Sequence, residues 1–215
     1  MARTGGSVTV GRVERVHLDE HSWVDVHHGW LPDADALYDE LVDTVPWQQS
    51  RLFKYDHWVD EPRLGSWQRN ETAHPVLLDA QRRIQDEYQV RFDGFGLAWY
   101  RDGRDSVAFH RDRDMKWLEE TVIVLLTLGA RRPWLVRPRD KKWSDEPGKG
   151  ATHDFAPGSG DLLVMGGRTQ VGWEHSVPKV PGLRAGRISA QWRWTSRRGR
   201  QEIGGSYRKP VTYSR

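Results

Sequence analysis

The chain has 215 residues, with 33 Lys and Arg against 30 Asp and Glu, a formal net charge of +3 and no cysteine. A length of this order suits one domain that buries a proper core. The absence of cysteine excludes disulfide frameworks, thiolate nucleophiles and zinc–thiolate sites.

Nothing in the sequence indicates export or a membrane. The segment from Met1 to Gly6 has no apolar run behind its positive charge, as a secretory signal would have. The longest apolar run, Val122–Leu126, is far too short to cross a bilayer. We therefore expect a soluble, cytoplasmic protein without a membrane partner, and we expect a monomer.

Basic residues gather in three places, at Arg131–Arg132, Arg137–Lys142 and Arg197–Arg200, in a chain that also contains 12 Trp. Cationic surface next to aromatic side chains suits a polyanion whose bases can stack. The same pattern also fits solvated loops on an ordinary basic protein. Composition thus permits a nucleic-acid partner without establishing one.

Helical patterns occupy the first part of the chain, after a loose strand or tail over residues 1–16. A helix is predicted to open at Pro32–Asp35, to bury Leu37 and Leu41, and to end at Pro46. A second is predicted after Pro75. Between the two helices, Trp47–Asn70 is polar and aromatic, which favours a long structured loop or a hairpin.

From Gly94 onward the apolar period changes from 3.6 to 2. Short strands punctuated by Pro and Gly indicate a sandwich or jelly roll rather than a βαβ sheet. The predicted strands are Phe95–Tyr100, Val107–His110, Thr121–Leu128, Trp134–Arg137, Thr152–Phe155, Asp161–Met165, Gly172–His175 and Gly186–Trp194. We therefore divide the chain into an N-terminal helical extension (1–93), a jelly-roll core (94–196) and a basic tail (197–215).

A metal site is predicted at His110, Asp112 and His175. In a strand, residues two apart share a face, so His110 and Asp112 can address one ion. His175, near a later strand end, supplies a third ligand. Two histidines and one carboxylate form the facial triad of non-haem Fe(II), which leaves positions open for a 2-keto acid and dioxygen. A single His-x-Asp pair is a weak signal, since it also arises by chance.

The strand Gly186–Trp194 alternates strictly. Arg187, Ser189, Gln191 and Arg193 share one face, and apolar side chains occupy the other. If the polar face lines the cavity of a jelly roll, its two arginines need anions, and a dicarboxylate provides one at each end. The other interpretation is an edge strand with arginines in solvent.

Together these segments resemble the AlkB family of Fe(II)/2-oxoglutarate-dependent dioxygenases over roughly residues 94–194. The similar motifs are Tyr100–Gly103 with Val107–Asp114, Leu126–Pro133, Gly160–Gly167, Trp173–Lys179 and Arg187–Arg193. The fold expected from the resemblance is α+β and mainly β, a double-stranded β-helix (jelly roll) with N-terminal helices and a nucleotide-recognition lid.

The resemblance also implies roles for particular residues. His110, Asp112 and His175 would hold Fe(II), and Asp114 would face the substrate base. Arg187 would bind the remote carboxylate of the co-substrate 2-oxoglutarate, and Arg193 the metal-proximal end. Tyr100 and Ser189 would assist. The implied reaction uses O2 to remove N-alkyl groups from bases such as 1-methyladenine or 3-methylcytosine in DNA or RNA, releasing formaldehyde, succinate and CO2.

Three positions depart from the family pattern. Ala98 stands where the family commonly has Asn, so one co-substrate hydrogen bond is missing or replaced. Ser189 replaces another Asn but remains polar, and Trp99 is bulky where a polar residue is common. These changes concern how the co-substrate is held rather than the reaction.

We interpret Trp47–Asn70 as the nucleotide-recognition lid. Trp58 and Trp67 would stack on a base, and Arg51, Arg63 and Arg69 would contact the nucleic-acid backbone. The competing interpretation packs these aromatics against the sheet as part of the core. A methylated base would have to leave a duplex to reach the iron.

Other functions remain open at this point. One is a 2-oxoglutarate oxygenase that acts on a small molecule or a protein. Another is a non-catalytic jelly-roll module that binds a ligand without iron, although the complete metal and arginine pattern argues against it. A zinc hydrolase fits less well, because two arginines facing the cavity would have no evident role there.

Overall fold

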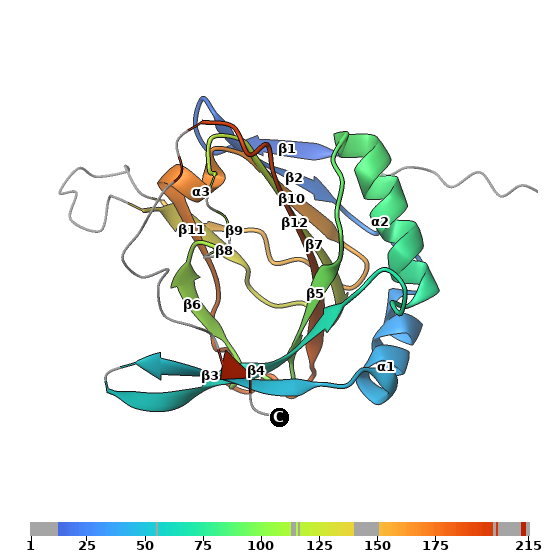
Figure 1. Cartoon of the computed structure of the whole chain (residues 1–215). Helices are drawn as coiled ribbons and strands as arrows, with labels where there is room; N and C mark the ends of the chain where they lie inside the picture. Colours follow the sequence, from blue (N-terminus) through green and yellow to red (C-terminus); the bar gives the residue numbers. More distant parts are fainter. Residues whose placement is uncertain are drawn as a thin grey trace, which may run out of the picture.

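The computed structural model describes residues 13–54, 56–112, 115, 117–139, 151–199, 201 and 212–213 of the chain (Figure 1). Within these ranges two antiparallel sheets face each other as a jelly roll, and helices cover the outer face of the larger sheet (Figure 1). No helix of the described ranges is long and apolar enough to cross a membrane.

The large sheet has nine strands among the described residues. In spatial order they are β1 (Glu14–His17), β2 (Ser22–His27), β10 (Leu162–Gly167), β7 (Thr121–Gly129), β12 (Arg187–Thr195), β5 (Phe95–Tyr100), β4 (His57–Gln68), β3 (Gln48–Lys54) and β13 (Thr212–Tyr213). The small sheet, over the same ranges, has the order β6 (Val107–His110), β11 (Trp173–Val177), β8 (Leu135–Pro138) and β9 (His153–Asp154).

Two helices, α1 (Ala34–Thr44) and α2 (Pro75–Tyr88), cover the outer face of the large sheet (Figure 1). Their apolar stripes, including Leu37 of α1 and Ile84 of α2, pack against Leu126 and Ile188 of the sheet. A second core lies between the sheets and includes Leu163 of the large sheet and Val136 of the small one. Both helices were predicted from their apolar spacing, and both predictions are confirmed.

Asp161 joins two loops at one end of the large sheet, immediately before β10. Its carboxylate accepts hydrogen bonds from the backbone N–H groups of Gly29 and Gly158, each at 2.8 Å. Burial acts to raise the pKa of Asp161, but these two bonds and the contact with His28 outweigh it and hold the pKa below its usual value. The ionised carboxylate therefore stabilises the end of the strand that carries Leu163.

The predicted strands from residue 94 onward are confirmed to within one or two residues at most ends. The division at residue 93/94 is wrong as a structural boundary, because β1 to β4 lie in the same sheet as β5, β7, β10 and β12. Strand β2 and the short helix α3 (Thr169–Gly172) were not predicted. In the tail, β13 pairs with β3.

The segment Trp47–Asn70 forms the hairpin that was one of its two predicted structures. Strands β3 and β4 extend the large sheet beyond β5, and the hairpin reaches past the end of β6 at the bottom of the view (Figure 1). The carbonyl of Pro62 accepts a hydrogen bond from the backbone N–H of Ser106 at 2.7 Å. The hairpin is thus tied to the loop that leads into β6.

Candidate metal and co-substrate site

The three predicted metal ligands come together between the two sheets. His110 of β6 and His175 of β11 are cross-strand partners, and their ring centroids lie 4.3 Å apart. With Asp112 they form a group whose ligand atoms all lie within 4.8 Å of one another. The prediction that residues 110 and 112 lie on one face of a strand is wrong, because β6 ends at His110 and Asp112 lies in the following loop. The two side chains come together all the same.

Polar atoms of this group differ in whether they have hydrogen-bond partners. The Nδ1–H of His110 donates to the Ala108 carbonyl at 2.8 Å, which leaves its Nε2 available as a lone-pair donor. Asp112 Oδ1 accepts from Arg193 at 3.0 Å. Among the described residues, Asp112 Oδ2 and His175 Nδ1 are buried without a hydrogen-bond partner. A buried carboxylate oxygen without a partner is costly, and a cation bound by the group would satisfy it.

The protonation states also suit a metal. Burial, and then the neighbouring His110, lowers the pKa of His175 to about 3. Burial likewise lowers the pKa of His110. Burial acts to raise the pKa of Asp112, but Arg193 and the two histidines outweigh it and hold the pKa far below its usual value. At neutral pH the group offers two neutral imidazoles and one carboxylate, the donor set that favours Fe(II).

A buried cation lies at the other end of β12. Arg187 is 0% exposed and pairs in register with Tyr100 of β5. Its Nη1 donates to the Arg132 carbonyl at 3.4 Å, while Nε and Nη2 have no partner within the described ranges. Burial lowers the pKa of Arg187 to about 10. A buried guanidinium with two unpaired N–H groups calls for an anion, and a carboxylate fits it bidentately.

A row of small residues crosses the large sheet at a level between Arg187 and Arg193. Ser189 of β12 lies opposite Ala98 of β5, which lies opposite Gly65 of β4. The Ser189 hydroxyl is buried and has no partner in the described part of the chain. A short diacid that spans this row would meet Arg187 at one end and a hydroxyl along its length. The residues present therefore fit both an iron ion and 2-oxoglutarate.

Arg193 lies at the metal end of the row. It donates to Gln191 at 2.7 Å as well as to Asp112, and a Cβ on Gly96 would lie 3.9 Å from its Nη1. Arg193 thus lies beside the metal ligand Asp112, and its role at the metal-proximal end of 2-oxoglutarate stays a prediction.

Arg63 occupies a different place from the one expected of a phosphate contact. Its Nη1 donates to the Tyr100 hydroxyl at 3.1 Å, its Nη2 lies 3.7 Å from Glu61, and its side chain is 21% exposed. The guanidinium thus points toward the co-substrate residues instead of outward. Had 57–68 been recognised as a strand, its alternation with Gly65 would have revealed this orientation.

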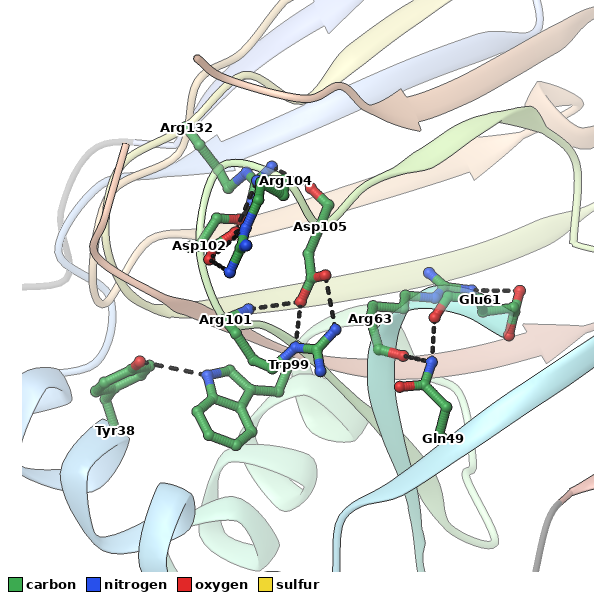
Figure 2. A network of polar contacts seen from close by, with 10 residues as sticks. All are labelled: Tyr38, Gln49, Glu61, Arg63, Trp99, Arg101, Asp102, Arg104, Asp105 and Arg132. Carbon is green, nitrogen blue, oxygen red and sulfur yellow. Dashed lines mark hydrogen bonds and ion pairs between the residues drawn. The ribbon is translucent and has the colours of Figure 1, made fainter. Parts of the chain in front are cut away.

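A network of ion pairs fixes the loop between β5 and β6, which joins Tyr100 to the ligand strand (Figure 2). Arg101 binds Asp105 bidentately at 2.7 and 2.9 Å. Arg132 is buried and donates to the backbone carbonyls of Asp102, Asp105 and Pro178 at 3.2, 2.7 and 2.8 Å. The interpretation of Arg132 as part of a basic surface cluster is therefore wrong.

The remaining predicted site residues lie on or near the hairpin, apart from Asp114, which falls outside the described residues. Trp58 is 44% and Trp67 63% exposed, and the indole of Trp67 lies over Gly94, where a Cβ would be 2.9 Å from it. Arg51 pairs with Asp60 at 2.9 Å, and Arg69 is exposed. Exposure leaves these aromatics available for stacking, and their binding roles stay predictions.

The structure resembles solved oxygenases of low sequence identity. A prolyl-4-hydroxylase from Pseudomonas putida covers 82% of this chain, and this chain covers 93% of it, with a TM-score of 0.51 and 16% identity. A Trichoplax adhaerens prolyl hydroxylase, solved with a hypoxia inducible factor peptide, covers 80% (83% of that chain) with a TM-score of 0.54 and 11% identity. Identities this low support the fold alone.

Sequence comparison is more specific. Residues 44–193 match the model of the 2OG-Fe(II) oxygenase superfamily. The alpha-ketoglutarate-dependent dioxygenase alkB homolog 3 of Bos taurus is 30% identical over 180 residues, 76% of this chain and 62% of the relative. The DNA oxidative demethylase ALKBH2 of Homo sapiens is 28% identical over 178 residues, 75% of this chain and 68% of the relative.

The aligned region thus spans about three fifths of the length of the alkB homolog 3 proteins. Residues 44–193, which match the superfamily model, contain the His-Asp-His group, Arg187 and the row of small residues between the levels of the two arginines. The chain belongs to the 2OG-Fe(II) oxygenase superfamily and, within it, to the AlkB family.

Proposed function

We propose that this protein is an Fe(II)- and 2-oxoglutarate-dependent dioxygenase that removes N-alkyl groups from nucleobases in DNA or RNA. One observation carries the proposal: Arg187, which is buried and has two N–H groups without a partner in the described residues, shares a face of β12 with Arg193, and Arg193 contacts Asp112 of the His-Asp-His group at 3.0 Å. The printed names of the AlkB relatives, a dioxygenase and a DNA oxidative demethylase, support the substrate class.

In this proposal His110, Asp112 and His175 hold the iron. Bound iron, 2-oxoglutarate and O2 together supply the oxidising chemistry, in which an N-methyl carbon leaves as formaldehyde and 2-oxoglutarate becomes succinate and CO2. Neutral imidazoles and an ionised carboxylate keep the ligand set free of competing protons. The two sheets bury Asp112 and His175, which limits the access of bulk water to these two ligands.

Arg187 binds the remote carboxylate of 2-oxoglutarate, with Tyr100 beside it. The Ser189 hydroxyl, which lies directly opposite Ala98, replaces the hydrogen bond that an Asn at position 98 would give. Arg193 holds the metal-proximal end and keeps Asp112 oriented through their 3.0 Å contact. Arg63, which donates to the Tyr100 hydroxyl, adds a third cation to the co-substrate site beside Arg187 and Arg193, and we do not assign it a phosphate contact.

The substrate reaches the site past the β3–β4 hairpin. Trp67 lies on the same strand as Arg63 and Gly65, four and two positions from them respectively, so its indole shares their face of the sheet. There Trp67 would stack on an unpaired base, and Trp58, nearer the hairpin tip, would stack on a base as well. Asp114 would contact the edge of the substrate base, and Arg51 and Arg69 would contact phosphates. Extrusion from a duplex, or a single-stranded substrate, supplies the unpaired base.

The test is an anaerobically iron-loaded enzyme, mixed with 2-oxoglutarate and oligonucleotides that carry 1-methyladenine or 3-methylcytosine, as DNA and RNA in single and double strands. We expect succinate, formaldehyde and restored base in equal amounts, and none with His110→Ala. Succinate that forms at the same rate with every oligonucleotide, without restored base, would contradict the nucleobase substrate. The same outcome would favour a small-molecule or protein substrate.

A further inference from the structure

A buried glutamine, Gln170, contacts the backbone of the metal ligand Asp112. Gln170 belongs to α3, the short helix between β10 and β11, and is 1% exposed. Its side-chain Oε1 accepts a hydrogen bond from the backbone N–H of Asp112 at 2.9 Å. The backbone carbonyl of Gln170 accepts a hydrogen bond from the Arg111 guanidinium, also at 2.9 Å. Both residues that follow His110 are therefore held by one residue of α3.

This contact matters because Asp112 stands outside the sheet. Strand β6 ends at His110, so the strand ladder does not fix the backbone of Asp112. Arg193 holds one carboxylate oxygen, but that contact acts on the end of a side chain. The bond from Gln170 acts on the backbone itself and thereby sets where the side chain starts.

The position of Gln170 in the chain strengthens the argument. Helix α3 ends at Gly172, and β11 begins at the next residue and carries His175. Gln170 is thus five residues before one ligand and in contact with the backbone of another. Ligands that are far apart in the sequence are connected through this single buried side chain, so a displacement of α3 would change the Asp112–His175 geometry.

We propose that Gln170 is a positioning residue of the metal site, and that it acts through the backbone of Asp112. The inference rests on the proposed function, since it assumes that the His-Asp-His group binds iron. Groups that orient metal ligands typically change metal affinity by about 10- to 100-fold when removed. We expect an effect of that size from the loss of the Gln170 oxygen.

The test compares Gln170→Met with Gln81→Met. Gln81 is also buried, at 5% exposure, and its Oε1 accepts from the indole N–H of Trp192 at 2.9 Å, in the core beneath α2. Both variants lose one buried acceptor and keep a similar volume. Gln170→Glu keeps an acceptor oxygen at the same reach and serves as the rescue. If Gln170→Met does not fold, Gln170→Asn, whose amide is one methylene shorter, takes its place.

The probe is Co(II), titrated into the metal-free full chain and followed by its visible absorption, together with thermal denaturation of each variant. We expect Gln170→Met to weaken Co(II) binding by about 10- to 100-fold and to shift the absorption bands. We expect both Met variants to lower the melting temperature. The Co(II) affinity of Gln81→Met should stay within about twofold of the wild type, and Gln170→Glu should bind Co(II) about as tightly as the wild type.

The inference is overturned if Gln170→Met keeps the Co(II) affinity and absorption bands of the wild type. It is also overturned if Gln81→Met or Gln170→Glu loses as much Co(II) affinity as Gln170→Met. Each of these results leaves the proposed function intact. If the wild type binds no Co(II), or binds it equally well in His110→Ala, the metal site itself is wrong, and the proposed function and the inference fall together.

Discussion

Replacing Arg187 by methionine should stabilise the protein without co-substrate and abolish its response to 2-oxoglutarate. The guanidinium is fully buried, has one long hydrogen bond at 3.4 Å, and has two N–H atoms without a partner in the described residues. Methionine retains most of the packing of the aliphatic stem. The variant therefore removes a buried charge and little else.

The size of the gain follows from the pKa of Arg187. Burial lowers it from 12.5 to about 10, and a difference of that size corresponds to about 3 kcal/mol. Since the folded-state pKa is the lower one, the destabilisation is fully present below pH 10 and disappears as the pH rises toward 12.5. The lost hydrogen bond offsets about 1 kcal/mol. A net gain of about 2 kcal/mol should raise the melting temperature by about 4–8 °C at neutral pH.

The assay is thermal denaturation of the metal-loaded protein with and without 2-oxoglutarate. At about 100 times its dissociation constant, 2-oxoglutarate should stabilise the wild type by about 2.7 kcal/mol and the variant not at all. Arg132→Met is the matched control. That buried arginine donates to three carbonyls, so its loss should lower the melting temperature. If Arg187→Met melts at or below the wild-type temperature, or still responds to 2-oxoglutarate, the argument is refuted.

Three further outcomes are expected. His110→Ala should abolish Fe(II) binding in calorimetry and succinate release with it, and an unchanged binding isotherm would count against the metal assignment. Trp67→Ala should weaken oligonucleotide binding by about 1–3 kcal/mol in fluorescence anisotropy and leave substrate-free 2-oxoglutarate turnover intact. A joint fall of both activities and of stability would mean that Trp67 is a core residue. Asp161→Ala should destabilise the fold by about 2–4 kcal/mol in denaturant titration, because the N–H groups of Gly29 and Gly158 lose their acceptor. The folded-state pKa of Asp161 is lowered. The difference in stability between Asp161→Ala and the wild type should therefore be full above the usual pKa of Asp161 and shrink as the pH falls below it. A stability difference that is independent of pH would contradict this account.

The parts of the fold that depend on local periodicity could be predicted from the sequence. The spacing of Leu37 and Leu41 predicts α1, and strict alternation after Gly186 predicts that Arg187 and Arg193 share the cavity face of β12. The His-x-Asp pair and His175 could be predicted because the donor set itself limits the choice of metal.

Features that depend on contacts between distant segments could not be predicted. Strand β2 contains Asp25 and His27, which look exposed in the sequence but are buried. Asp25 accepts from Arg15 and from Tyr88 of α2, at 2.6 and 2.9 Å, and His27 contacts the same tyrosine hydroxyl at 2.9 Å. A polar residue signals burial only when its partner is known, and here the partner lies in another element. The same reason hid the burial of Arg132.

The pairing of β2 with β10 has a consequence for how the chain reaches its native state. Val24 is the register partner of Met165, so β2 pairs with a strand that follows it by 141 positions (165 − 24) in the sequence. Pairings of such long sequence separation form late and slow down folding. A shortened chain that begins after His27 would expose the β10 edge, with its unpaired backbone groups, and such an edge promotes aggregation. Expression trials with N-terminally trimmed chains should therefore keep the segment from Val13 onward.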